Sequence, residues 1–361
     1  MSNFVQFPLA EFDRNAFDGF TPTSDFSLPN ARALMWFAQL AYEVDTSGQN
    51  ATAAKIDTIR TGWGFTSVTP FRGAGAAFNA SFDTTGLFGE RPDAVVLAFA
   101  GTDPAVWQTV VTDFNLRIDP ATNTHHGFRA AFSTSEITNN VNAAIDLSRR
   151  TGKPLFIAGH SLGAALAILA ARQAVGNNAA PRAVYGYGTP RVGDATFRNE
   201  YNTSMAADGI PLGQVTYRLV HGLDIVARVP PETVASLIPV PDLKYVHVGR
   251  ALECATRTKF GEANLSAQAS NDPDVTVNYV RQLMQSAGVQ GLAGILGIFA
   301  LGHVPSPQEF VSTLLRQLPP RGHGPLAEWL RLLPAPIREH LQDQYIDALT
   351  AGPGRILGGA V

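Results

Sequence analysis

The residues best suited to chemistry are the five at positions 159–163, Gly-His-Ser-Leu-Gly, which match the pattern G-x-S-x-G. In this pattern a serine occupies a sharp turn between a strand and a helix, where its hydroxyl stands clear of the sheet. Residues 154–158 suit a buried strand, and residues 161–175 are rich in Ala and Leu, as a helix would be. The motif in this context predicts that Ser161 is a nucleophile activated by a base. The alternative is a glycine-rich connection in an inert α/β domain.

A nucleophilic serine of this kind works with a histidine, and a carboxylate orients that histidine. In the fold that uses this motif, the order along the chain is Ser, then Asp or Glu, then His. Asp224 follows the predicted strand 215–220 and lies in the loop at its end. This position suits a carboxylate that orients an imidazole, but it suits a turn-capping Asp equally well. The residues alone leave both interpretations open.

The negative charge that develops on an attacked carbonyl oxygen needs backbone N–H donors. One donor comes from the residue after the nucleophile, here Leu162, and another from a loop after an early strand. Thr102 follows the apolar run 94–100 and can offer its backbone N–H and its hydroxyl. We therefore expect Thr102 and Leu162 to form an oxyanion hole, although residues 101–104 also read as an ordinary turn.

Apolar segments of two lengths alternate along the chain and predict the scaffold that positions these residues. Short runs predict strands, longer apolar segments predict helices, and their alternation predicts an α/β fold with a mostly parallel central sheet and helices on both faces. The predicted strands are 65–71, 77–82, 94–100, 154–158, 183–187 and 215–220, and the predicted helices are 31–44, 135–150 and 161–175.

The chain is expected to divide into four parts. Residues 1–30 show no hydrophobic period and read as an extended N-terminal arm, and residues 31–253 form the α/β core. Residues 254–335 read as a mainly helical insertion interrupted by proline, with a glycine-rich apolar stretch at 288–302. This insertion is a candidate cap or acyl pocket, although an added buried helix fits the pattern equally well. Residues 336–361 are predicted to return to the core as a C-terminal helix.

Composition narrows the classes of partner. The net charge of −3 offers no electrostatic basis for binding nucleic acid. The single cysteine, Cys254, cannot form a disulfide within the chain. The sequence has no apolar run of about 18 residues, the length that would predict a membrane-spanning helix. Its N-terminus shows no secretory signal. We therefore expect a cytoplasmic protein, one secreted without a leader, or the mature form of a secreted one. No cofactor or metal is expected.

These segments together resemble the fungal-type, class 3 triacylglycerol lipases of the α/β-hydrolase superfamily. The resemblance covers about residues 31–253. The motifs that carry it are Phe99-Ala100-Gly101-Thr102 with Trp107 and Asp113, His126-Gly127-Phe128, the 159–163 segment, Tyr187-Gly188-Thr189-Pro190-Arg191-Val192-Gly193-Asp194, the 224–231 segment DIVARVPP, and Tyr245-Val246-His247-Val248-Gly249.

The resemblance implies ester hydrolysis through Ser161, with Asp224 as the carboxylate and Thr102 and Leu162 as oxyanion donors. The sequence departs from the family in three places. Ala100 stands where the family usually has Arg, the gap from Trp107 to Asp113 is longer, and so is the stretch before the final histidine.

Three histidines that follow Asp224 are candidates for the base. His247 lies in the segment Y-x-H-x-G, where the family's histidine is not the base, and His303 follows the apolar stretch. His340 lies in a segment that resembles the family's final D-H-x-x-x-x-Y, where the base opens or precedes the last helix. We take His340 as the base and keep His303 and His247 as alternatives. The histidines at 125, 126, 160, 221 and 323 are read as structural.

The segment after Thr102 lies where the family has its lid. Trp107, Val110 and Val111 are spaced i, i+3, i+4, so they share one helix face, and Val106 adjoins them. Such a helix could open at a lipid–water interface, or it could pack permanently on the core. The resemblance thus predicts a triacylglycerol lipase acting on a lipid or ester. Phospholipase A1, short-chain carboxylesterase, acyltransferase and non-catalytic interaction protein are the alternatives. The oligomeric state is not predicted.

Overall fold

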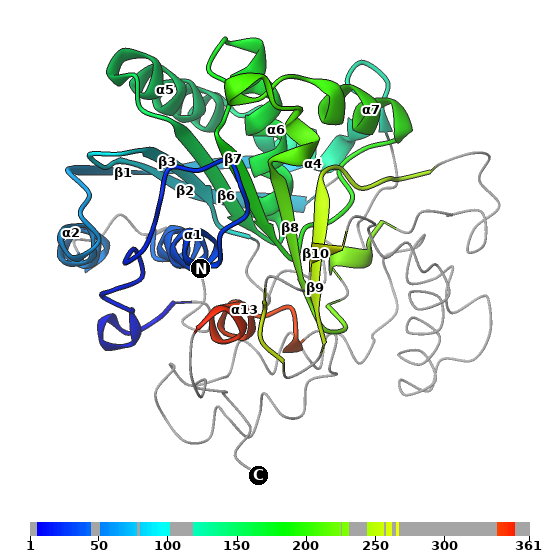
Figure 1. The fold of residues 1–361 in the computed structure, drawn as a ribbon. Coiled ribbons are helices and arrows are strands. Elements are labelled where there is room, and N and C mark those ends of the chain that lie inside the picture. The colour runs from blue at the N-terminus through cyan, green and yellow to red at the C-terminus, as the bar shows by residue number, and fades with distance from the viewer. Residues whose placement is uncertain are drawn as a thin grey trace.

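An eight-stranded sheet lies at the centre of the computed structural model of this protein (Figure 1). Its strand order is β1-β2-β3-β6-β7-β8-β9-β10. The structure describes residues 6–44, 51–77, 80–101, 118–224, 226–230, 244–255, 258–261, 265–266 and 338–350.

The five strands in the middle of the sheet run parallel to one another. Every residue of β3, β6, β7 and β8 is buried, as expected for strands that are covered on both faces. The predicted fold class is confirmed. These strands are β3 (Val95–Phe99), β6 (Leu155–His160), β7 (Ala183–Tyr187), β8 (Thr216–His221) and β9 (Arg250–Cys254).

The two edges of the sheet are antiparallel. On one edge β1 (Ser67–Ala77) pairs with β2 (Ala80–Glu90), which in turn pairs with β3, and on the other edge β10 (Leu265–Ser266) pairs with β9. The first two strands are longer than predicted from the sequence. The pairing of β1 with β2 includes glycines and polar residues such as Arg72, opposite Thr85, and these residues carry no strand pattern of their own.

Alternate residues of the buried strands serve two separate apolar cores, because successive side chains of a strand point to opposite faces. Val96 and Ala98 pack on one face, whereas Val95, Leu97 and Phe99 pack on the other. In Figure 1, α1 (Leu28–Tyr42) and α13 (Gln342–Leu349) cover the first face. The second face is covered by α4 (His126–Phe132), α5 (Ser135–Thr151) and α6 (Leu162–Gly176).

The remaining elements complete the layers. They are α2 (Ala51–Gly62), α7 (Ala195–Thr203), the two-stranded pair β4 (Ile118–Asp119) and β5 (Thr124–His125), and the 3-10 helices η1 (Leu9–Glu11), η2 (Ala207–Gly209), η3 (Leu212–Gln214) and η4 (Val226–Arg228).

Residues 6–27 form turns and the short helix η1 instead of the extended arm expected from the sequence. Four phenylalanines in this segment are buried in the core beside α1, at positions 7, 12, 17 and 20. Helix α1 begins at Leu28 and is capped by the Ser27 side chain, which accepts a hydrogen bond from the Asn30 N–H. The Asn30 side chain makes two hydrogen bonds with the backbone of Thr21. Its Oδ1 atom accepts the Thr21 N–H, and its Nδ2 atom donates to the Thr21 carbonyl oxygen, which holds the segment against the helix.

Most of the predicted insertion at 254–335 lies outside the described residues, so the division into domains stays a prediction. Among the residues that the structure does describe, no helix has the length and apolar character needed to span a membrane.

Replacing Phe17 by Ala tests whether the N-terminal segment belongs to the core. The Phe17 ring is 5% exposed and lies edge-on to Phe65 and Phe37, with centroids 5.1 and 6.1 Å away. Removing a buried ring leaves a cavity, so we expect the free energy of unfolding to fall by about 3–5 kcal/mol in urea titrations. Leu9→Ala in the same segment is the control, because Leu9 is 37% exposed, and should cost about 0.5 kcal/mol or less. Equal unfolding midpoints for the two variants would contradict this packing.

Candidate active site

Ser161 occupies a strained turn between β6 and α6. Its backbone has φ 59° and ψ −128°, a region that residues with a side chain rarely adopt. Its N–H donates to the carbonyl oxygen of Tyr187 in the neighbouring strand β7, at 2.9 Å. Such strain persists only where the surrounding structure enforces it, and it presents the serine hydroxyl at the carboxyl edge of the sheet.

Two glycines let helix α6 approach the sheet closely at this turn. A Cβ atom on Gly159 would lie 2.1 Å from the carbonyl oxygen of Gly163, and a Cβ atom on Gly163 would lie 2.4 Å from that of Phe99. No side chain fits at either position. The close approach aims the N-terminal end of α6 at the space beside Ser161, where the helix dipole favours negative charge.

Ser161, His340 and Asp224 form one continuous chain of hydrogen bonds. The Nε2 atom of His340 lies 2.8 Å from Ser161 Oγ, and its Nδ1 atom lies 2.9 Å from each Asp224 carboxylate oxygen. All three residues are buried. Ser161 follows β6, Asp224 follows β8, and His340 comes just before α13. The structure brings together the three residues predicted from the sequence, and their catalytic roles stay predictions.

The Asp224 carboxylate is fully buried, and three donors surround it. Besides His340, the Tyr345 hydroxyl donates to Oδ2 at 2.5 Å, and the Val226 N–H donates to Oδ1 at 2.8 Å. Burial by itself would raise the pKa of Asp224. The charge of His340 and the hydrogen bonds from His340, Tyr345 and Val226 outweigh burial and lower this pKa below its ordinary value. Asp224 is therefore ionised at neutral pH.

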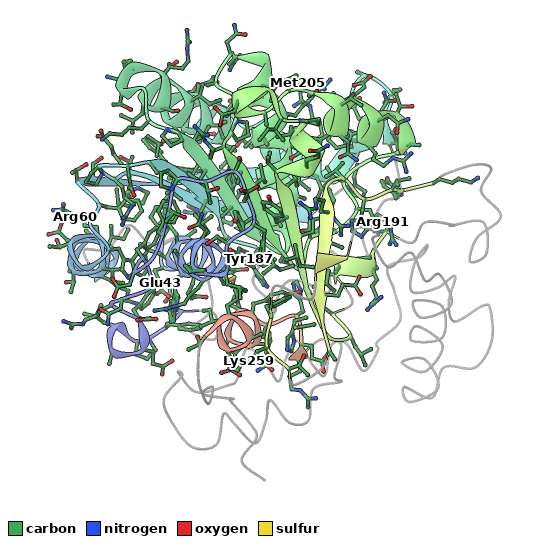
Figure 2. The ribbon with its side chains drawn as sticks, in the orientation of Figure 1. Glu43, Arg60, Tyr187, Arg191, Met205 and Lys259 are labelled. Carbon is green, nitrogen blue, oxygen red and sulfur yellow. The ribbon has the colours of Figure 1, made fainter. Side chains whose placement is uncertain are left out.

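The loop that carries Asp224 is held on both sides by residues to which sequence analysis assigned no role. Before Asp224, the Glu339 carboxylate accepts the N–H of Leu223. After it lies Arg191, whose side chain is labelled in Figure 2. Its guanidinium donates to the carbonyl oxygens of Arg228 and Pro230, the latter at 2.8 Å. Their sequence neighbours are the available signal, since Glu339 directly precedes His340 and Arg191 lies in the recognised 187–194 motif.

The other candidate bases have different surroundings. His247 is buried, and its Nε2 atom lies 2.8 Å from the carbonyl oxygen of Ala227. Burial, together with the charges of nearby arginines, holds the pKa of His247 well below its ordinary value. His303 lies outside the described residues. His340 is thus the described candidate that contacts Ser161.

One of the two predicted oxyanion donors can be placed. Leu162 is the first residue of α6, so its N–H has no acceptor within the helix and is available to a ligand. Thr102 lies outside the described residues, but its neighbour Gly101 is described. A Cβ atom on Gly101 would lie 2.6 Å from Ser161 Cβ, so the chain reaches the serine directly before Thr102. The candidate lid residues Val106, Trp107, Val110 and Val111 also lie outside the described residues.

His125, which was read as structural from the sequence, contacts backbone groups of α4. The Nδ1 atom of His125 accepts the backbone N–H groups of Gly127 and Phe128 at the start of α4. Across the described ranges, no group of three or more His, Cys, Asp or Glu side chains is arranged to hold a metal ion.

Residues 96–234 match the family model described as Lipase (class 3). This segment of the chain is similar to the class 3 lipases. The matched segment contains Ser161 and Asp224 but ends before His340. Lipases hydrolyse carboxylic esters, so the match supports the predicted activity of a carboxylic-ester hydrolase. The place of His340 in the site rests on the geometry described above.

Several fungal lipases of known structure are similar to this chain. A mutant of MDLA from Penicillium cyclopium has 19% identity and a TM-score of 0.48, with 70% of this chain and 92% of that chain covered. Lipase II from Rhizopus niveus has 20% identity and a TM-score of 0.45, with 66% of this chain and 88% of that chain covered. The mono- and diacylglycerol lipase from Aspergillus oryzae has 20% identity and a TM-score of 0.46, with 67% of this chain and 86% of that chain covered. No curated protein matches the sequence.

Gly188→Ala tests the packing around the Asp224–His340 pair. Gly188 has φ +58°, and a Cβ atom there would lie 2.5 Å from Asp224 Oδ2 and 2.8 Å from His340 Nδ1. The added methyl group must displace one of these side chains, and misplacement by about 1 Å lowers turnover roughly a hundredfold. We expect a loss of at least that size in kcat on p-nitrophenyl esters.

The matched control for this variant is Gly209→Ala. Gly209 also has a positive φ, +72°, but a Cβ atom there would meet nothing within 4 Å. Both substitutions carry a similar backbone cost, so a difference in kcat isolates the contact with the pair. Similar kcat values for the two variants would show that Gly188 does not constrain the site.

Proposed function

We propose that this protein is a triacylglycerol lipase that cleaves its substrate through an acyl-enzyme formed on Ser161. The observation that carries the proposal is the hydrogen-bond chain from Ser161 Oγ through His340 to Asp224, with links of 2.8 and 2.9 Å. It lies in a buried site at the carboxyl edge of the sheet. This geometry suits proton transfer from the serine to the imidazole as the serine attacks an ester.

In the first half of the proposed reaction, Ser161 Oγ bonds to the ester carbonyl carbon while His340 Nε2 takes the serine proton. Asp224 stabilises the imidazolium that results, because it is ionised and bonded to Nδ1–H. The carbonyl oxygen gains negative charge and receives the Leu162 N–H, with Thr102 proposed as the second donor. His340 then gives its proton to the alcohol oxygen, and the bond between that oxygen and the acyl carbon breaks.

The second half repeats these steps with water. His340 Nε2 removes a proton from a water molecule, whose oxygen attacks the acyl carbon of the ester on Ser161. The tetrahedral intermediate uses the same donors. Its collapse breaks the bond to Ser161 Oγ, His340 returns the proton to the serine, and a carboxylic acid leaves.

The substrate class rests on the resemblance to triacylglycerol lipases rather than on a described pocket. The candidate lid at Val106, Trp107, Val110 and Val111 supports action at a lipid–water interface, because an apolar helix face beside the site would be exposed on opening. Phospholipase A1 and short-chain carboxylesterase are the alternative activities for the same three residues, and a non-catalytic protein is the alternative to both.

Ser161→Ala tests the nucleophile. Loss of the hydroxyl should abolish labelling by a fluorophosphonate probe and lower kcat by roughly 10⁴- to 10⁶-fold. Asp224→Asn should lower kcat by roughly 10⁴-fold, because the amide does not hold the imidazole in the required tautomer. Ser133→Ala is the control, since Ser133 is exposed and its hydroxyl bonds only the helix carbonyl of Arg129 among the described residues. Labelling that survives in Ser161→Ala would refute the proposed nucleophile.

The dependence of rate on substrate concentration tests the lipid assignment. With tributyrin, we expect the rate to rise sharply once the ester exceeds its solubility and forms an emulsion, because the interface favours the open lid. Soluble p-nitrophenyl acetate should give an ordinary saturation curve. A smooth curve for both esters would identify a carboxylesterase, and faster hydrolysis of phosphatidylcholine vesicles than of triacylglycerol emulsions would identify a phospholipase.

A further inference from the structure

A second histidine, His160, lies directly against the proposed base. The His160 and His340 rings are stacked, with centroids 4.7 Å apart and planes at 25°. His160 Nε2 lies 2.8 Å from the backbone carbonyl oxygen of His340, and His160 Nδ1 lies 2.7 Å from the hydroxyl of Tyr42 in α1. His160 is 2% exposed and immediately precedes Ser161, so it touches both the proposed nucleophile's turn and the proposed base.

These contacts fix the direction of both hydrogen bonds. A carbonyl oxygen can only accept, so His160 Nε2 must carry the hydrogen that binds His340. Burial, followed by the charge of His340, lowers the pKa of His160 to about 3, so the ring is neutral at ordinary pH. A neutral ring has one hydrogen, and Nδ1 therefore accepts from the Tyr42 hydroxyl. The chain of donors runs from Tyr42 to His160 to the His340 backbone.

We propose that His160, anchored by Tyr42, is a positioning residue that holds His340 in the orientation required for proton transfer from Ser161. The inference rests on the proposed function. The bonds from Nδ1 to Asp224 and from Nε2 to Ser161 hold the two nitrogens of the His340 ring but leave the ring able to tilt about the line that joins them. The flat face of His160 blocks the tilt, and the bond to the His340 carbonyl fixes the backbone from which the ring extends.

Neutrality is part of this role. The proposed mechanism places a positive charge on His340 in the transition state, and a charged ring stacked on it would oppose that charge. The groups that face His160 are Tyr42 of α1, Tyr345 of α13 with its ring centroid 5.6 Å away, and the His340–Asp224 pair. Of these groups, Asp224 is the one carboxylate. Its hydrogen bonds are made to His340, Tyr345 and Val226. The hydrogen bonds of His160 are made to Tyr42 and to the backbone of His340.

Three variants separate positioning from simple packing. His160→Phe keeps a flat ring but removes both hydrogen bonds, and we expect kcat to fall roughly ten- to a hundredfold with KM little changed. His160→Gln offers an amide N–H for the His340 carbonyl and an oxygen for Tyr42, and should recover most of kcat. Tyr42→Phe removes one hydroxyl and should lower kcat about two- to tenfold. Each kcat is divided by the number of sites titrated with a fluorophosphonate, so loss of folded protein does not count.

The outcomes distinguish this inference from the proposed function. Wild-type kcat per titrated site in His160→Phe would overturn the positioning role, and so would a His160→Gln variant as slow as His160→Phe. If His160→Phe does not fold, Tyr42→Phe decides, because an unchanged kcat there would also overturn it. Ser161→Ala in the same assay tests the proposed function separately, since its activity must vanish whatever the His160 variants do.

Discussion

The hydrogen bond between His340 Nε2 and Ser161 Oγ joins residues that are 179 positions apart, and the site depends on it. The sheet supplies one half of the juxtaposition, because the parallel order β6-β7-β8 brings the residues after β6 and β8 to one edge. The docking of α13 beside α1 supplies the other half, because it returns His340 to that edge. Neither half alone would give the serine a base.

A buried charge is the second constraint on this site. Asp224 is 0% exposed, and an isolated carboxylate in such a place would be costly. The donors that offset this cost come from His340, from Tyr345 in α13 and from the backbone at Val226. Two of these donors, His340 and Tyr345, also tie the loop to α13 and the turn before it, so charge and geometry are set together.

Patterns of neighbouring residues in the sequence predicted the central strands and two of the site residues that follow them. The strands β3, β6 and β7 are continuous apolar runs between turns, and Ser161 follows β6. Asp224 follows β8, which was also predicted as a strand. The aromatic packing of residues 6–20 has no period, so the sequence did not reveal it. The brace from Arg191 to the loop after Asp224 and the stacking of His160 on His340 join distant segments, and contacts of that kind leave no spacing to read.

A crystal structure of the enzyme inhibited by an alkyl phosphonate would test the central claim most directly. The account predicts phosphorus bonded to Ser161 Oγ, one phosphonyl oxygen about 3 Å from the Leu162 N–H, and His340 Nε2 within hydrogen-bond distance of an oxygen on phosphorus. The imidazole should keep its bond to Asp224. An adduct on a different residue, or an adduct on Ser161 served by a different histidine while His340 points away, would contradict the account.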